Sequence, residues 1–208
     1  MPTFTESTEA KEELLNLLRT NSVRHGKFVL SSGAESDYYV DCKLTTLDPH
    51  GAWLVGQVMY SLIAREAAEQ GVSVDAVGGL TMGADPIALA VGMYSYCAKE
   101  GNPVQTFIVR KTPKSHGQAK LIEGNFKSGD SVVVIDDVVT RGDSTIKAIE
   151  AVTQAGGRIA FVAVLVDRQQ GGRNKIENMG YKVVSAFERD QLLGSDAKSH
   201  RPADCIAA

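Results

Sequence analysis

Hydrophobic positions follow a helical period in the first part of the chain, apart from one stretch in which they alternate. Leucines between residues 8 and 19 share one helical face, which predicts a first helix. Alternating apolar residues over 24–42 predict a hairpin that turns at Ser32 and Gly33. A second apolar stripe predicts a helix over about 51–70, and Gly71 is well placed to end it.

After this helix the pattern changes to short apolar runs separated by helical segments. The predicted strands are 74–77, 104–109, 131–135, 159–166 and 181–187, and the predicted helices are 85–99, 144–155 and 173–179. Continuous apolar strands are typical of a parallel sheet that helices cover on both faces, so we expect an α/β fold. Ligands of such sheets bind beyond the carboxyl ends of the strands. We therefore expect the chemistry just after Val77, Val109, Ile135 and Val166.

Composition narrows the class of protein. The 208 residues suit one domain, and a net charge of −3 argues against general nucleic-acid binding. The longest apolar run, 159–166, is far shorter than the roughly 20 residues that a membrane helix needs. The first residues are acidic and polar, unlike a secretory signal, and three widely spaced cysteines suit a reducing compartment. We expect a soluble cytoplasmic protein with neither a nucleic-acid nor a membrane partner.

Two acids, Asp136 and Asp137, follow the strand 131–135 and precede a turn rich in Thr, Gly and Ser that leads into a helix. The N–H groups and hydroxyls of such a turn can hold a phosphate at the positive end of the helix dipole, while the carboxylates accept hydrogen bonds from sugar hydroxyls or approach a metal. The alternative is that the acids only begin a turn and that Ser144 or Asp143 caps the helix. The run V-V-V-I-D-D-V-V-T-R-G-D-S-T resembles the phosphoribosyl-pyrophosphate (PRPP) motif of type I phosphoribosyltransferases.

About twenty residues without strong periodicity lie between Val109 and Ser131, and loops of that length are usually lids or disordered segments. No acid occurs in this loop before Glu123, whereas its cationic residues are Arg110, Lys111, Lys114, His116 and Lys120. Such cations would suit the neutralisation of pyrophosphate as it leaves. The alternatives are a solvated charge run and, more weakly, a nucleic-acid patch, since no aromatic residues are interleaved.

Arg168 follows the strand 159–166, where its guanidinium could pair bidentately with a planar carboxylate of a ligand. The alternative is an ion pair with a surface acid such as Asp167. The segments R-K-T-P-K-S-H-G and D-R-Q-Q-G resemble the catalytic loop and the base-binding arginine of orotate phosphoribosyltransferases, and F-V-L-S-S-G-A-E-S-D-Y-Y-V-D is similar to the hairpin of that family. The resemblance covers about 23–187.

This resemblance implies a Rossmann-like type I phosphoribosyltransferase fold, with a five-stranded, mainly parallel sheet flanked by helices. It implies one domain, made of a small N-terminal hood (about 1–45), a catalytic core (about 46–194) and a tail (195–208). It also implies transfer of ribose 5-phosphate from PRPP to orotate in pyrimidine biosynthesis, with Mg²⁺ bound mainly through PRPP rather than directly by side chains. A homodimer is implied, in which the loop 110–120 reaches the neighbouring site.

The resemblance also implies residue roles. The catalytic residues would be Lys111, Lys114 and His116. The PRPP-binding residues would be Arg110, Lys111, Lys114, His116, Asp136, Asp137, Val138, Val139, Thr140, Arg141, Gly142, Asp143 and Ser144. Orotate would contact Thr140 and Arg168, and Tyr38 and Tyr39 could either stack on the base or pack within the hairpin. Many family members have lysines where this chain has Ser31 and Gly83, so the cations at those two positions are missing.

Three other functions remain open at this point. The first is a purine phosphoribosyltransferase, which Arg168 and the R-K-x-x-K-x-H loop disfavour. The second is a PRPP-sensing regulator without turnover, which would need an output element such as a DNA-binding helix-turn-helix. The third is a nucleotide-binding structural protein, which would leave the cationic loop unexplained.

Overall fold

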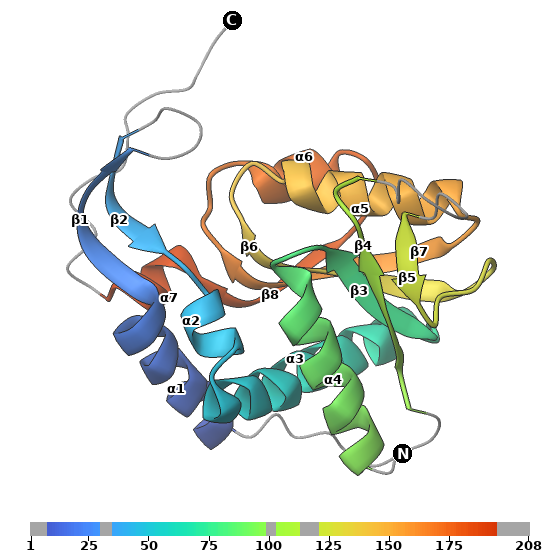
Figure 1. Ribbon diagram of the computed structural model, residues 1–208, viewed down its shortest axis with the longest axis horizontal. Coiled ribbons are helices and arrows are strands. Elements are labelled where there is room, and N and C mark those ends of the chain that lie inside the picture. Colours follow the sequence, from blue (N-terminus) through green and yellow to red (C-terminus); the bar gives the residue numbers. More distant parts are fainter. Residues whose placement is uncertain (1–7, 30–34, 99–102, 113–120, 195–208) are drawn as a thin grey trace, which may run out of the picture.

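A six-stranded sheet forms the centre of the molecule (Figure 1), with strand order β5-β4-β3-β6-β7-β8. The computed structural model describes residues 8–29, 35–98, 103–112 and 121–194. Every neighbouring pair of strands is parallel except β4 and β5, which are antiparallel. The α/β class and the mainly parallel sheet expected from the sequence are confirmed. All five predicted strands are present, and β5 at the edge is an additional short strand.

The strands of this sheet are β3 (Ala76–Leu80), β4 (Gln105–Val109), β5 (Ile122–Gly124), β6 (Ser131–Val139), β7 (Arg158–Asp167) and β8 (Val183–Glu188). The helices are α1 (Thr8–Leu17), α2 (Lys43–Thr46), α3 (Pro49–Gln70), α4 (Ala84–Ala98), α5 (Asp143–Gln154), α6 (Gly172–Glu177) and α7 (Arg189–Leu193), and a π-helical turn, η1 (Leu18–Ser22), continues α1. In the described part of the chain, no helix has both the length and the apolarity that a membrane crossing needs.

Helices cover both faces of the sheet. In Figure 1, α3 and α4 lie on one side and α5 and α6 on the other. The central strand β6 contributes side chains to the apolar core on each face of the sheet, because side chains alternate between the faces of a strand. Val133 and Ile135 pack in the core with α3 and α4, whereas Val132 and Val134 pack in the core with α5. The fully buried, continuous apolar run is therefore that of a strand covered on both sides.

An antiparallel hairpin of β1 (Val23–Val29) and β2 (Glu35–Val40) forms a separate two-stranded sheet. In Figure 1 it lies beyond one end of the main sheet, near α7. The predicted hairpin is thus confirmed, although its turn at Ser32 and Gly33 lies outside the described residues. The short helices α2 and α7 were not predicted, because four or five residues are too few to establish a helical period.

Two strands, β3 and β6, extend by more than one residue beyond their predicted ends. β3 begins at Ala76 and ends at Leu80 rather than Val77, because the glycines that suggested a turn lie within the strand. A Cβ at Gly78 would lie 2.1 Å from the carbonyl oxygen of Phe107, and one at Gly79 would lie 2.0 Å from that of Ile135. These glycines therefore permit a close approach of neighbouring backbone, as glycine inside a strand often does.

β6 extends to Val139 instead of ending at Ile135. Its parallel ladder with β7 continues through the pairs Asp136–Val164, Val138–Val166 and Val139–Asp167. The two acids therefore lie within a hydrogen-bonded strand and not in a loop. This pairing fixes their backbone, so the positions of the acidic side chains are more constrained than the sequence suggested.

Candidate active site

The segments that follow β3, β4, β6 and β7 lie at one edge of the sheet, because these strands are mutually parallel. The ladder pairs Val139 with Asp167, so the next residues, Thr140 and Arg168, emerge side by side. The two residues expected to contact the base thus come together beside the acid pair. Arg110 follows β4, which β3 separates from β6.

The side chain of Asp136 is held by residues that follow it in the chain. Asp136 is only 4% exposed, and its Oδ2 accepts hydrogen bonds from the hydroxyls of Ser144 and Thr145, each at 2.7 Å. Its Oδ1 accepts a 3.1 Å hydrogen bond from the backbone N–H of Asp137. The carboxyl group at the end of the strand is therefore joined directly to the first turn of α5, which sets the distance between the acids and the start of that helix.

Burial, and after it the negative charge of Asp137, raise the pKa of Asp136 from 3.8 to about 7. The hydroxyls of Thr145 and Ser144 oppose this shift by stabilising the charged form. Near neutral pH this carboxyl group therefore exchanges between a form that only accepts hydrogen bonds and a form that also donates one. Either form can bind a sugar hydroxyl.

Asp137 is half-buried, and its Oδ1 accepts a 2.9 Å hydrogen bond from the backbone N–H of Val138. Gly83, in the turn after β3, lies directly against it, because a Cβ at position 83 would be 2.4 Å from this same oxygen. A larger residue at position 83 would have to displace the carboxylate. This contact gives a physical reason for a glycine where the family resemblance led us to expect a lysine.

Lys43, at the start of α2, is a cation that the sequence analysis did not single out. Its Nζ lies 2.6 Å from Oδ1 of Asp41. The hydrogen bond with Asp41 raises the pKa of Lys43, and the charge of Asp137 adds to the shift. The preceding thiol, Cys42, is fully buried, and burial raises its pKa, which keeps it protonated and unreactive.

The first turn of α5 is free of a side-chain cap within the described residues, so the alternative in which Ser144 or Asp143 caps this helix is wrong. The N-cap is Gly142, whose φ of 78° favours glycine. Asp143 instead faces outward, 2.7 Å from Nζ of Lys175 and 3.8 Å from Nε of Arg141. The hydrogen bond from Lys175 lowers the pKa of Asp143. A helix start with no side-chain acceptor suits a phosphate.

Arg168 is buried, with 6% exposure, although it carries a positive charge. Its Nε donates a 3.2 Å hydrogen bond to the hydroxyl of Tyr38, and within the described residues its buried Nη2 has no hydrogen-bond partner. A buried charged donor without a partner is costly, and an anionic ligand would satisfy it. The alternative in which Arg168 pairs with Asp167 is wrong, since Asp167 has another partner.

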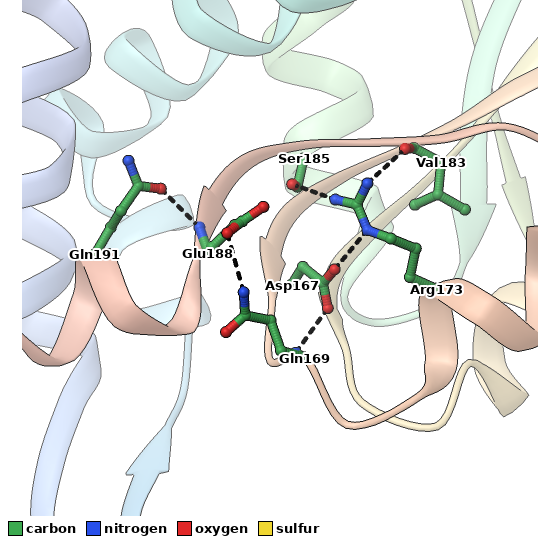
Figure 2. Close-up of polar contacts among 7 residues, drawn as sticks. All are labelled: Asp167, Gln169, Arg173, Val183, Ser185, Glu188 and Gln191. Atoms are coloured by element: carbon green, nitrogen blue, oxygen red, sulfur yellow. Dashed lines mark hydrogen bonds and ion pairs between the residues drawn. The ribbon is translucent and has the colours of Figure 1, made fainter. Parts of the chain in front are cut away.

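That partner is Arg173, as Figure 2 shows. Its Nε lies 2.7 Å from Oδ2 of Asp167, while Nη1 donates to the carbonyl of Val183 at 3.0 Å and Nη2 to the hydroxyl of Ser185 at 2.7 Å. The other oxygen of Asp167 accepts a 2.8 Å hydrogen bond from the backbone N–H of Gln169. These contacts fix the residues immediately before and after Arg168, which are Asp167 and Gln169.

The cationic loop is described only in part. Nη1 of Arg110 lies 3.7 Å from Oε1 of Glu123, its Nε donates to the carbonyl of Thr112 at 3.3 Å, and Lys111 is exposed. The backbone N–H of Arg110 donates to the carbonyl of Leu121 at 2.8 Å, so the two ends of the loop are joined. Lys114, His116 and Lys120, together with Ser31, lie outside the described residues.

No model of a known protein family matches the chain. Individual relatives do match. The orotate phosphoribosyltransferase of Aquifex aeolicus (strain VF5) is 42% identical over 186 residues, which cover 88% of this chain and 97% of that protein. The enzyme of the same name from Streptomyces coelicolor is 44% identical over 186 residues, covering 89% and 98%. The chain belongs to the orotate phosphoribosyltransferase family.

A solved structure agrees with this membership of the orotate phosphoribosyltransferase family. The crystal structure of Mycobacterium tuberculosis H37Rv orotate phosphoribosyltransferase in complex with PRPP superposes with a TM-score of 0.72 and 35% identity, covering 89% of this chain and 99% of that one. The type I phosphoribosyltransferase fold that we expected is thereby confirmed. The purine enzyme and the regulator are no longer the best descriptions of the chain.

Two contacts of this site leave a signal in the burial pattern that no local motif carries. Tyr38 and Tyr39 alternate along β2, so one of them had to face inward, and it is Tyr38 that is buried. Asp167 ends a strand covered on both faces, so its charge required a partner, which is Arg173. Lys43 gave no comparable signal, because α2 itself was not predicted.

Proposed function

We propose that the chain transfers ribose 5-phosphate from PRPP to orotate, releasing pyrophosphate and forming orotidine 5′-monophosphate (OMP) for pyrimidine nucleotide synthesis. The observation that carries this proposal is Arg168, a buried guanidinium with an unpartnered Nη2 that emerges beside Thr140. A planar carboxylate on the base matches such a group. The names of the relatives, at 42% and 44% identity, support the same substrate.

In the proposed reaction the bond between C1′ of the ribose and the pyrophosphate oxygen breaks, and a bond from C1′ to a ring nitrogen of orotate forms. Positive charge develops on the sugar as the first bond breaks, so the protein acts mainly through electrostatics. Asp136 and Asp137 bind the ribose hydroxyls, and residues 138–144 bind the 5′-phosphate at the start of α5. Thr140 and Arg168 bind orotate. The attacking ring nitrogen of orotate loses its proton to the released pyrophosphate or to water, so no strong general base from the protein is required.

The cations of the loop after β4 are proposed to act on the leaving group. Arg110, Lys111, Lys114 and His116 contact the pyrophosphate, and Lys111, Lys114 and His116 are the catalytic residues. We expect Lys111→Ala and Lys114→Ala to lower kcat far more than they weaken PRPP binding, because the leaving oxygen carries more negative charge in the transition state than in bound PRPP. Steady-state kinetics with a PRPP-binding titration measures both quantities. An unchanged kcat in both variants would remove the loop from the mechanism.

Mg²⁺ is the proposed cofactor. Its chemistry fits the acid pair of β6, since carboxylate oxygens are the hard ligands that this ion prefers, and Asp137 is only half-buried. The ion would be bound mainly through PRPP, with Asp136 and Asp137 beside it, and it would neutralise charge on the pyrophosphate. The side chains themselves orient the ribose and keep its hydroxyls hydrogen-bonded.

We further propose a homodimer in which the loop 110–120 reaches the neighbouring site. Supporting this, Leu89, Met93 and Tyr96 on α4 are 58%, 62% and 71% exposed, and they line a groove between α4 and β4. Monomeric proteins rarely leave large apolar side chains clustered in this way. Residues 1–45 are proposed as a hood over a core of residues 46–194. A cytoplasmic location is supported by Cys42 and Cys97, which are both free thiols.

The test of the activity is a spectrophotometric assay. Purified protein with PRPP and Mg²⁺ is expected to consume orotate, followed by its ultraviolet absorbance, and to leave adenine and hypoxanthine unchanged. The variant that tests base recognition is Arg168→Gln, which keeps a polar side chain but removes the charge and the guanidinium, and it should lose most of the kcat/KM for orotate. Turnover of a purine in preference to orotate, or no release of pyrophosphate at all, would overturn the proposal.

A further inference from the structure

Tyr38 occupies an unusual position between the hairpin and the core. Tyr38 is only 7% exposed, and the centroid of its ring lies 4.6 Å from Cζ of Arg168 and 5.5 Å from Cζ of Arg189. Two guanidinium groups therefore lie over one aromatic ring, at distances at which cation–π attraction is significant. Positions 38 and 168 are 130 residues apart, so this contact is made across the fold.

The hydroxyl of Tyr38 adds a directional contact to this stacking. It accepts a 3.2 Å hydrogen bond from Nε of Arg168, which is the nitrogen closest to the side-chain stem. Fixing Nε as well as the distance to the ring restricts both the tilt and the rotation of the planar guanidinium. Its terminal nitrogens remain for a ligand, and Nη2 is the atom that is buried without a partner among the described residues.

Bidentate recognition of a carboxylate depends on the plane of the guanidinium, because two parallel N–H···O bonds form only when both groups are coplanar. A side chain that must be ordered on binding loses affinity through conformational entropy. Tyr38 removes that cost before the ligand arrives. With the guanidinium groups of Arg168 and Arg189 over its ring, Tyr38 is better suited to hold an arginine than to stack on a base.

We propose that Tyr38 is a positioning residue for base recognition: its hydroxyl and ring hold Arg168 in the orientation that pairs with the carboxylate of the pyrimidine. This rests on the role proposed above for Arg168. The hairpin thus contributes to the choice of base without contacting the carboxylate itself. Arg189, whose Nε is also buried without a partner in the described part of the chain, stacks on the same ring and completes the contact.

A pair of nucleotides separates this role from a merely structural one. OMP and uridine 5′-monophosphate (UMP) differ only by the carboxylate, so the ratio of their dissociation constants reports carboxylate recognition. Tyr38→Phe keeps the ring and removes the hydroxyl. We expect it to weaken OMP binding about tenfold, at the lower end of the cost of losing one hydrogen bond to a charged group, and to leave UMP binding within about twofold. Isothermal titration calorimetry measures both.

The matched control is Tyr39→Phe, which removes a hydroxyl from the next residue of the same strand. Tyr39 is 41% exposed, and its ring lies 5.7 Å from that of Phe28, so we expect no change with either nucleotide. Arg168→Gln tests the role on which the proposal rests and should bring the two dissociation constants together. If it does not, the role of Arg168 is wrong.

Two outcomes would overturn the positioning role of Tyr38 while leaving that of Arg168 intact. In the first, Arg168→Gln removes the preference for OMP, but Tyr38→Phe leaves OMP binding unchanged. In the second, Tyr38→Phe weakens OMP and UMP equally, which would mark a general loosening of the hairpin. Tyr38→Leu, which also removes the ring, should reduce the preference for OMP further than Tyr38→Phe does.

Discussion

At the scale of single residues, the acid pair of β6 combines two opposing requirements. The ribose-binding role proposed for Asp136 needs a rigid side chain, and three hydrogen bonds hold its two carboxylate oxygens. Burial beside Asp137 nevertheless makes its charge unfavourable, which raises its pKa to about 7. The proposed PRPP site thus contains an acid that is partly protonated near neutral pH in the absence of ligand, and the stability of the protein should depend on pH.

The sign of that dependence follows from proton linkage. The pKa of Asp136 is about 7 in the folded protein and 3.8 in the unfolded chain, so the folded state binds more protons between these two pH values. The free energy of unfolding should therefore fall as pH rises through this window. Asp136→Asn removes this contribution, so its stability relative to the parent should improve from about pH 5 to about pH 8. Urea unfolding at several pH values measures the difference.

Asp143→Asn is the control for this prediction. The pKa of Asp143 is lowered by its exposed hydrogen bond to Lys175, so its contribution has the opposite sign and is lost only as pH falls through the acidic range. Between about pH 5 and about pH 8 its stability curve should run parallel to that of the parent. Parallel curves for Asp136→Asn as well would contradict the raised pKa of Asp136.

Gly83 gives a second prediction at this scale. A Cβ there would be 2.4 Å from Oδ1 of Asp137, so Gly83→Ala must displace that carboxylate. We expect the KM for PRPP to rise about tenfold, equivalent to the loss of one hydrogen bond to a charged group, with a nearly unchanged melting temperature. Gly83→Lys should behave similarly and not improve activity. A variant with the parent KM would show that Asp137 does not hold the ribose.

Among single residues, those with a local pattern could be predicted and those with a distant partner could not. Asp136, Asp137 and Arg168 stand in recognisable runs at the ends of apolar strands. Tyr38 and Arg173 act through partners from other elements, and no local pattern reveals such contacts. Burial reasoning identifies that a partner is needed, but only the packing of the elements shows which residue provides it.

At the scale of elements, the site depends on how β6 and β7 end. The predicted ends of β3 and β6 were too early because glycines and acids usually mark turns, and here both lie within strands. The ladder between β6 and β7 overrides these local preferences and places Thr140 beside Arg168. Local propensity decided the existence of the strands, whereas pairing with neighbours decided their length.

The segment after β7 depends on one side chain of α6. Arg173 pairs with the buried Asp167 and also bonds to β8 (Figure 2). Removing one partner of a buried pair leaves an uncompensated charge, so we expect Arg173→Met to lower the free energy of unfolding by about 3 kcal/mol and to raise the KM for orotate. Urea unfolding and steady-state kinetics measure these effects.

Lys175→Met, on the same helix, is the matched control for Arg173→Met. Lys175 bonds to the exposed Asp143, and exposed pairs contribute little to stability. We expect the free energy of unfolding and the KM for orotate to stay close to the parent values. Equal destabilisation by both substitutions would mean that α6 itself, and not the contact with Asp167, determines the order of the segment.

At the scale of the whole molecule, the apolar side chains of α4 determine the proposed assembly. Met93→Glu places a charge within the groove between α4 and β4 and should convert a dimer into a monomer. Size-exclusion chromatography with light scattering measures the mass. Because the loop 110–120 is proposed to reach the neighbouring site, kcat should fall together with dimerisation.

Glu150→Lys is the control, since Glu150 is an exposed residue of α5, on the opposite face of the sheet. It should change neither the mass nor kcat. A parent protein that is already monomeric and fully active would contradict both the dimer and the reach of the loop. A dimer that persists in Met93→Glu would place the interface elsewhere on the molecule.

The contact between Tyr38 and Arg168 has a consequence for how such enzymes diversify. In the proposed mechanism the phosphate-binding residues and Arg168 lie at strand ends and helix starts of one continuous sheet, whereas the orientation of Arg168 depends on a tyrosine of a separate small hairpin. Exchanging that hairpin between related chains should therefore change how strongly the carboxylate of the base is recognised while sparing sugar-phosphate affinity, so the two traits can evolve independently.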